Sequence, residues 1–317
     1  MSDRPVIEVT GLVVEYPTSP RSGTTPVRAV DGLDLEVRIG EVYALLGENG
    51  AGKTSTIEVL EGHRRRTSGT VRVLGHDPAR RGRPGREWRD RIGVVLQSSG
   101  IEPELTVREA VALFAGVYSR PRPAGEVLAV VGLDDRADVP IGALSGGQRR
   151  RLDLATAIVG RPEVLFLDEP TTGFDPSARR RAWEVISGLC SEGTTVVLTT
   201  HYLDEAEHLA DRVGIMSAGR LVVEGTPDEL QRRSGTSRVD VALSSTVTVE
   251  AVSVVLDGLV TSVSVDGNRL GVVTAEVTEV LARLTTWAGA NGIVLDDWSV
   301  ERPSLEQVFI DLTEGRS

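Results

Sequence analysis

Residues 47–54 read GENGAGKT and directly follow the apolar run YALL. The spacing matches the phosphate-binding pattern G-x-x-x-x-G-K-[ST], in which glycines let backbone N–H groups wrap around phosphates. The residues that follow, KTSTIEVLE, have a helical pattern that ends at Gly62. An apolar strand, this loop and a helix, in that order, predict that the chain binds a nucleotide.

Two side chains of the loop have distinct expected tasks. The Lys53 ammonium supplies positive charge to the outer phosphates, and the Thr54 hydroxyl coordinates Mg²⁺. The residues of this segment that we expect to bind the nucleotide are Gly47, Asn49, Gly50, Ala51, Gly52, Lys53, Thr54 and Ser55.

Polar residues end three further apolar strands. Asp168 and Glu169 end EVLFLDEP, Gln97 ends IGVVLQ, and His201 ends VVLTTH. Strands that alternate with helices predict a mainly parallel sheet, and ligands bind such sheets at the carboxyl ends of the strands. We therefore expect these side chains to gather near Gly47. Asp168 is the expected Mg²⁺ carboxylate, which leaves Glu169 free to orient or polarise water.

Composition limits the class of protein. The 317 residues carry a formal net charge of −11, which argues against broad electrostatic binding to nucleic acid. Cys190 is the one cysteine, so no internal disulfide is possible. No apolar run reaches the length of about 18 residues expected of a spanning helix, and the N-terminus has no apolar signal core. A cytosolic protein is expected, and any membrane contact would depend on a partner.

The acidity is concentrated in the last part of the chain, which suggests a second domain. Residues 240–317 hold 12 acidic and 4 basic residues, whereas the rest is nearly balanced. Their strand and helix patterns follow the order β-α-β-β-α-β, with a DGN turn, which is typical of a small ferredoxin-like α+β module. We predict a first domain over 1–233, with a helical subdomain over about 98–160, and an accessory domain over 234–317.

A second anion-binding pattern lies in ALSGGQRRRLDLA, residues 143–155. Ser145 and two glycines precede a helical pattern. Exposed N–H groups, a hydroxyl and the positive end of a helix dipole attract anions. One chain of this size with one nucleotide does not need two such sites, so the second site requires another explanation.

These motifs together resemble the ATP-binding cassette (ABC) ATPases. The resemblance covers residues 1–230 and is carried, in order and spacing, by 47–54, Gln97, 144–148, 167–170, 173–175 and His201. It implies an α/β P-loop NTPase fold with an antiparallel β subdomain and a helical subdomain.

The resemblance also implies a role for each matching residue. Glu169 corresponds to the catalytic base, and His201 to the histidine that contacts the γ-phosphate. Gln97 corresponds to a glutamine that touches Mg²⁺ or the attacking water and reports to a transmembrane partner. Tyr16 corresponds to the aromatic residue that stacks on adenine.

In this family the LSGGQ segment closes over ATP that a second cassette holds, which accounts for the second anion site. Two copies, expected to form a homodimer, would enclose two ATP molecules and separate after hydrolysis. The residues that the resemblance places at this composite site are Ser145, Gly146, Gly147, Gln148 and Asp175.

The segments TTHYLDEAE and ERPSLEQVFIDLT resemble exporter ATPases of the daunorubicin/doxorubicin-resistance type. This resemblance implies an ATP-hydrolysing motor subunit on the cytoplasmic side of the cell membrane. A separate permease would carry the efflux of drugs, antibiotics or lipid-like molecules. The alternative is a soluble ABC ATPase without a role in transport. Such proteins generally have two cassettes or a coiled-coil insertion, and neither pattern is present in this sequence.

Four arginine-rich clusters are interpreted mainly as solvated faces. They lie at 64–66, 80–91, 149–151 and 179–181. Glycine and proline interrupt ARRGRPGREWRDR, residues 79–91, so this stretch is expected to be a loop. It could contact lipid headgroups or the permease.

Overall fold

The computed structural model describes residues 5–17, 26–95, 100–233, 235–301 and 304–314. Contacts divide the chain into two compact units, Met1–Pro227 and Asp228–Ser317. The second unit takes all of α8 (Pro227–Arg233) except its first residue. The domain bounds of 1–233 and 234–317 stay a prediction from the sequence.

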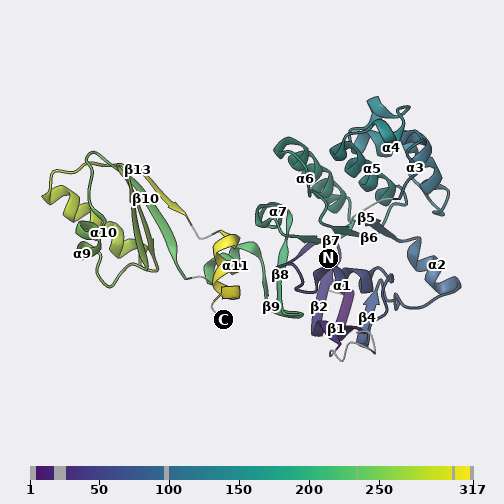
Figure 1. Ribbon diagram of the computed structural model, residues 1–317, viewed down its shortest axis with the longest axis horizontal. Helices are drawn as coiled ribbons and strands as arrows, with labels where there is room; N and C mark the ends of the chain where they lie inside the picture. Colours follow the sequence, from purple (N-terminus) through teal and green to yellow (C-terminus); the bar gives the residue numbers. More distant parts are fainter. Residues whose placement is uncertain (1–4, 18–25, 96–99, 234, 302–303, 315–317) are drawn as a thin grey trace. The chain divides into compact units, whose positions relative to one another are not determined.

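A six-stranded sheet forms the centre of the first unit (Figure 1). The strand order is β5-β6-β7-β3-β8-β9, and every neighbouring pair is parallel except β8 with β9. The central strands β3, β6 and β7 are buried along their whole length, which is why they read as continuous apolar runs. The bounds are β3 (Val42–Gly47), β5 (Ile92–Val95), β6 (Val164–Asp168), β7 (Thr195–Thr200), β8 (Arg212–Ser217) and β9 (Arg220–Gly225).

The carboxyl ends of three central strands are level with one another. Asp168 pairs with Thr199, and Leu46 pairs with Thr200. This register brings the phosphate loop, the Asp168–Glu169 pair and His201 to one edge of the sheet, as the sequence predicted.

Three helices pack on this sheet close to that edge. They are α1 (Lys53–Leu60), α6 (Pro176–Ser191) and α7 (Leu203–Leu209). Helix α1 contacts β3, β6 and β7, α7 contacts β3 and β7, and α6 contacts β7 and α7. Helix α1 ends where the sequence indicated, because Gly62 adopts a left-handed φ of 75° after its last turn.

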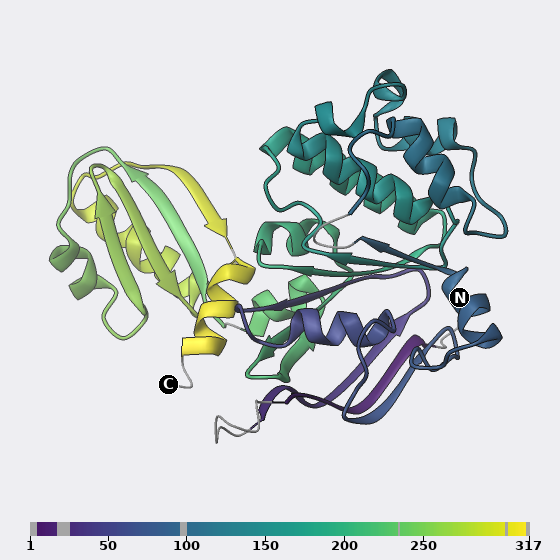
Figure 2. The same cartoon turned by 45° about the vertical axis from the view of Figure 1, so that its right-hand side comes forward.

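A separate antiparallel sheet forms the β subdomain that the resemblance implied. Its strands are β1 (Pro5–Tyr16), β2 (Val27–Arg38) and β4 (Ser68–Val73), in the order β2-β1-β4. Figure 2 shows it below the six-stranded sheet, beside α1. Its buried side chains, such as Ile7 and Leu12, share one core with Tyr43 of β3 and Ile57 of α1.

The helical subdomain contains α3 (Val107–Ala115), α4 (Ala124–Val130) and α5 (Gly146–Ile158), which contact one another. The start of α3 and the start of α5 are both fixed by reciprocal capping boxes, Thr106 with Glu109 and Ser145 with Gln148. These caps fix where each helix begins, including α5, whose first turn contains the two glycines of the LSGG segment.

The prediction of a loop over 79–91 is wrong in its second half, where α2 (Arg83–Arg89) forms. Pro84 lies in the first helical turn, where its missing N–H costs nothing. Gly85 is buried so close to the chain that a Cβ there would lie 2.4 Å from the Arg80 carbonyl oxygen. Trp88 is buried at 1% exposure and anchors the helix to the core. Pro84 is therefore compatible with the start of α2, and Gly85 allows the helix to pack closely against the Arg80 backbone.

The second unit has a ferredoxin-like core, in agreement with the sequence. The strand order is β11-β12-β10-β13, all antiparallel, and two helices cover one face. A separate helix α11 follows β13. The bounds are β10 (Ser237–Leu243), α9 (Val249–Val255), β11 (Ser262–Asp266), β12 (Arg269–Thr274), α10 (Val277–Ala290), β13 (Leu295–Glu301) and α11 (Leu305–Glu314).

Within the described residues, no helix combines the length and the apolar character needed to cross a bilayer.

Candidate functional site

Two positions of the phosphate loop, Gly50 and Gly52, require glycine. Gly52 caps α1 with a φ of 104°, and a Cβ there would lie 2.2 Å from the Ala29 carbonyl oxygen. Gly50 also has a left-handed φ of 84°, but its Cβ position is open. The loop therefore needs Gly52 for close packing and Gly50 for its conformation.

Lys53 folds back over this loop. Its Nζ donates hydrogen bonds to the carbonyl oxygens of Gly47 at 2.7 Å and Glu48 at 3.1 Å. Burial lowers the pKa of the Lys53 ammonium, whereas the nearby charges of Glu169 and Asp168 oppose that shift. The ammonium is thus held beside the loop with the two carboxylates close by.

Asp168 and Glu169 both face the site, although they are consecutive. Asp168 ends β6, is buried, and its Oδ1 accepts a hydrogen bond from the Thr199 hydroxyl. Glu169 adopts a φ of 49°, a left-handed conformation that is strained for glutamate. Its N–H donates to the carbonyl oxygen of Thr199 at 3.1 Å. The turn breaks the strand alternation and redirects the Glu169 carboxylate.

His201 lies beside that carboxylate. Its Nδ1 is 3.4 Å from Glu169 Oε1, and 41% of its side chain is exposed. The predicted meeting of the residues at the strand ends is therefore seen for Asp168, Glu169 and His201. Gln97 lies outside the described residues.

The LSGG segment presents a capped helix end to solvent. Ser145 is exposed, and its hydroxyl accepts the Gln148 N–H at the start of α5. Gly146 is open, whereas a Cβ on Gly147 would lie 3.9 Å from the Phe174 ring. Asp175, the next residue, caps α6 through the N–H groups of Ser177 and Ala178. The two predicted interface segments are thus neighbours in one chain.

Comparison with known proteins identifies the family. The model of the ABC transporter family matches residues 30–172. The daunorubicin resistance ATP-binding protein DrrA3 of Streptomyces coeruleorubidus is 41% identical over 295 residues, which cover 90% of this chain and 91% of the relative. The chain belongs to the ABC transporter family. As an ATP-binding subunit of this family, it is an ATPase.

Other relatives and a solved structure agree. Nod factor export ATP-binding protein I of Burkholderia orbicola is 42% identical over 206 residues, which cover 63% of this chain and 67% of that protein. A solved ATP-binding subunit of an ABC transporter has a TM-score of 0.62 and 26% identity, over 73% of this chain and 93% of that one. These comparisons give no support to the alternative of a soluble ABC ATPase without a role in transport.

Tyr16 is the predicted adenine-stacking residue of this ABC subunit. Both its hydroxyl and one face of its ring already have contacts within the chain. Its hydroxyl is 2.8 Å from the hydroxyl of Ser55, the buried residue after Thr54. The Arg64 guanidinium lies 4.3 Å from its ring centroid, a cation–π distance. An adenine that stacks on Tyr16 would use the other face of the ring. Arg64 lies 48 positions further along the chain, and no local pattern indicated that it packs on Tyr16.

Arg150 is the residue of the ABC cassette that sequence reasoning missed. Its Nη2 donates to the carbonyl oxygens of Asp168 at 2.6 Å and Glu169 at 3.0 Å, and its Nε donates to that of Pro170 at 3.2 Å. Only 12% of its side chain is exposed. Arg150 therefore links helix α5 by hydrogen bonds to residues 168–170, the segment that contains the candidate catalytic carboxylate of Glu169.

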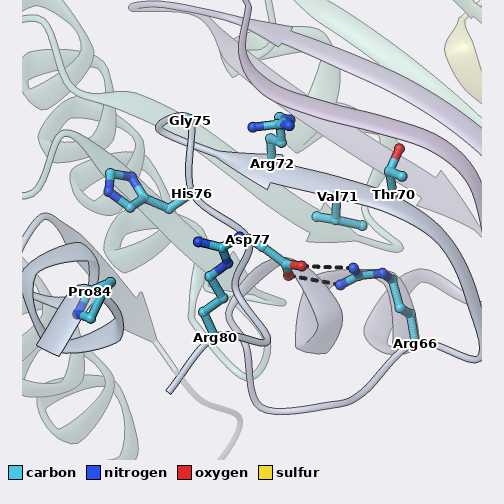
Figure 3. A pocket seen from close by; sticks show the side chains of 9 residues that line it. All are labelled: Arg66, Thr70, Val71, Arg72, Gly75, His76, Asp77, Arg80 and Pro84. Atoms are coloured by element: carbon cyan, nitrogen blue, oxygen red, sulfur yellow. Dashed lines mark hydrogen bonds and ion pairs between the residues drawn. The ribbon is translucent and has the colours of Figure 1, made fainter. Parts of the chain in front are cut away.

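The interpretation of the arginine clusters as solvated faces is wrong for several members. Besides Arg150, the Arg151 guanidinium donates to the Gly132 carbonyl oxygen at 2.6 Å. Arg66 binds Asp77 through two hydrogen bonds of 2.8 Å at one end of a polar pocket of about 310 Å³ (Figure 3). A helix advances about 100° per residue, so three consecutive arginines on α5 could not all face solvent.

Thr54 and Asp168 fit the Mg²⁺ that this fold family implies. Thr54 is exposed at the start of α1, and Asp168 offers a carboxylate at the level of the phosphate loop. Hydroxyl and carboxylate oxygens are the ligands that Mg²⁺ prefers.

Proposed function

We propose that this chain is the motor subunit of an ABC exporter that works as a pair of copies with a separate permease. The observation that carries the proposal is the convergence of Lys53, Asp168, Glu169 and His201 at one sheet edge. The LSGG helix start of the same chain is exposed instead of forming part of this cluster.

The proposed roles follow from the positions of the residues. The loop backbone of 47–52 and the Lys53 ammonium bind the β- and γ-phosphates of ATP. Thr54 and Asp168 would hold Mg²⁺, which would neutralise phosphate charge. Gln97 stays a predicted ligand of Mg²⁺ or water, and Tyr16 stacks on adenine through its free face.

Hydrolysis requires a water to attack the γ-phosphorus in line with the leaving oxygen of ADP. Glu169 accepts the proton of that water as the new P–O bond forms and the bond to the bridging oxygen breaks. His201 Nδ1 lies 3.4 Å from Glu169 Oε1, and in this proposal the imidazole also contacts the γ-phosphate. The strained turn at Glu169 fixes the direction of its carboxylate before ATP binds.

The LSGG segment serves the partner's ATP in this proposal. Ser145, Gly146 and Gly147 offer a hydroxyl and N–H groups at the positive end of α5 to a γ-phosphate. Two copies then form two composite sites, and loss of the γ-phosphate contact releases them. ATP thus drives association because it binds the closed pair better than the open one.

An apolar groove supports a permease as the further partner. A cavity of about 710 Å³ beside α2 and α3 has a mainly apolar surface from side chains such as Val94, Phe114, Val117 and Tyr118, and charged side chains also line it, namely Glu61, Arg86, Glu87, Arg89 and Asp90. Val117 is 78% exposed, and the neighbouring Leu113 is 62% exposed. Exposed apolar surface of this kind marks interaction sites. We propose that a short helix of the permease fills the groove, on the cytoplasmic side of the membrane.

The cargo class comes from the relatives. Their names refer to daunorubicin resistance and Nod factor export. We propose efflux of a drug-like, antibiotic or lipid-like molecule for this chain.

The experiment co-expresses the chain with a candidate permease from a neighbouring open reading frame and co-purifies the two. Val117→Asp should abolish the complex and keep the ATPase activity of the isolated chain, because it puts a charge at the exposed apolar side chain against which the permease helix would pack. Val130→Asp is the control, since Val130 is exposed on α4 and does not line the groove. Equal complex formation by Val117→Asp and the normal chain would contradict the proposed docking site.

A further inference from the structure

Glu205 is a fully buried acid that the ATPase site described above does not use. It lies in the first turn of α7 and has 0% exposure. Burial raises the pKa of its carboxyl, and no ion pair to Glu205 is present among the described residues. Carboxyl groups are rarely buried this way unless hydrogen bonds hold them. Its surroundings therefore call for an explanation.

Three neighbours from distant parts of the sequence surround the carboxyl. The Trp183 indole N–H donates to Glu205 Oε1 at 3.2 Å. The side chains of Thr200 and Thr171 also lie beside the carboxyl and lower its pKa against the effect of burial. The Thr200 hydroxyl oxygen accepts the Tyr202 N–H at 2.9 Å, which leaves its own hydrogen to donate.

Each neighbour belongs to a segment of the catalytic machinery. Thr171 follows Glu169 by two residues, and Thr200 directly precedes His201. Trp183 lies on α6, the helix that Asp175 caps. One buried carboxyl thus touches the segments that carry the candidate base, the phosphate-sensing histidine and the interface aspartate.

The contact between Thr171 and Glu205 lacks a well-formed hydrogen bond in this conformation. Thr171 Oγ1 and Glu205 Oε2 are both buried, and neither atom makes a well-formed hydrogen bond among the described residues, although the Thr171 hydroxyl lies near enough to the carboxyl to lower its pKa. Buried polar atoms without partners cost free energy, so two such atoms close together favour a shift that joins them. A small movement of the loop after Glu169 would satisfy both atoms at once.

We propose that Glu205 is a positioning residue for ATP hydrolysis. It holds Thr200, and hence His201, in place, and it receives the Thr171 hydroxyl when the loop carrying Glu169 closes on bound ATP. This inference rests on the proposed roles of Glu169 and His201. Glu205 itself touches neither substrate nor water in this scheme.

Other contacts keep α7 in place without Glu205. The Arg179 guanidinium on α6 pairs with Asp204 at 3.0 Å and lies 4.3 Å from the ring centroid of Tyr202. The Trp183 and His208 rings stack with centroids 4.7 Å apart. Removal of the Glu205 carboxyl should therefore leave the first unit folded and displace the loops that carry Glu169 and His201.

The experiment measures steady-state ATPase kinetics of Glu205→Ala, Glu205→Gln and Trp183→Phe in the full chain. Glu205→Ala should lower kcat by about tenfold or more and leave KM for ATP within about threefold. The reason is that the loops with Glu169 and His201 would be misplaced for hydrolysis, whereas the phosphate loop that binds ATP is unchanged. Glu205→Gln should restore most of the loss, since its amide oxygen accepts the Trp183 indole N–H and its NH₂ group donates to the Thr171 hydroxyl oxygen. Trp183→Phe, which removes one donor, should give an intermediate kcat.

Glu207→Ala on the exposed side of the same helix is the control and should keep the normal kcat. Equal kcat values for Glu205→Ala and Glu207→Ala would overturn the inference. So would a Glu205→Gln variant no more active than Glu205→Ala. If Glu169→Gln kept full turnover, the proposed role of Glu169 would fail instead, so the two failures are distinguishable.

Discussion

Replacement of Arg150 by methionine tests how α5 is joined to the catalytic segment. Methionine keeps the unbranched stem as far as the Nε position and removes all of the donors. Three hydrogen bonds to carbonyl oxygens, at 2.6, 3.0 and 3.2 Å, are lost at a side chain that is 12% exposed. At about 1–1.5 kcal/mol for each bond, the gross loss is about 3–4.5 kcal/mol.

Part of this loss is offset by the burial of the charge itself. Burial lowers the pKa of the Arg150 guanidinium, so the folded state already bears a desolvation cost that methionine removes. We therefore expect a net destabilisation of the first unit by about 3 kcal/mol. In urea, with a slope of about 2 kcal/mol per molar, the midpoint should fall by about 1.5 M.

The assay is urea unfolding followed by tryptophan fluorescence, with the transitions of the two units fitted separately. Trp88 and Trp183 lie in the first unit. Arg149→Met is the matched control on the same helix, because Arg149 is exposed and, within the described part of the chain, its side chain donates one hydrogen bond, to the Gly142 carbonyl oxygen at 3.0 Å. It should shift the stability by less than about 1 kcal/mol. Equal shifts for the two variants would refute the assigned role of Arg150.

Three further substitutions test the nucleotide site. Lys53→Ala should weaken ATP binding by about tenfold or more in a titration, because it removes a charge-assisted contact, and an unchanged titration would contradict its role. Ser145→Arg should block ATP-dependent pairing and leave ATP binding by a single chain within about twofold; an equal loss of binding would mean that Ser145 acts within its own chain. Tyr16→Phe should keep the ATP affinity and cost about 1 kcal/mol or less of stability through the lost Ser55 contact, whereas Tyr16→Ala should weaken ATP binding by about tenfold. Equal ATP affinity for the two Tyr16 variants would argue against stacking.

Local patterns were sufficient for the main architecture. The apolar runs of β3, β6 and β7 are continuous because these strands are buried on both faces, and such runs are visible in the sequence. The start of α5 was visible because Ser145 and two glycines precede a helical pattern, and in the structure Ser145 and Gln148 cap the helix reciprocally. The meeting of Asp168 and His201 followed from a general rule on strand ends.

Contacts between distant segments were not visible in the sequence. Arg150 was interpreted as part of a solvated cluster, since nothing near it in the sequence shows the carbonyl oxygens of Asp168–Pro170. The acidic stretch LDEAE looks like an exposed helix, yet Glu205 is buried against Trp183, 22 positions earlier. Helix α2 was missed because Gly85 and Pro84 usually interrupt helices, while the burial of Trp88 favours one here.

The central claim is that two copies of this chain close on ATP. Its most direct test is the molar mass of Glu169→Gln, measured by light scattering on a size-exclusion column with and without ATP and Mg²⁺. The variant keeps the phosphate contacts and loses the proton acceptor, so we expect a dimer that persists with ATP and a monomer without it. A variant that stays a monomer at saturating ATP would contradict the claim.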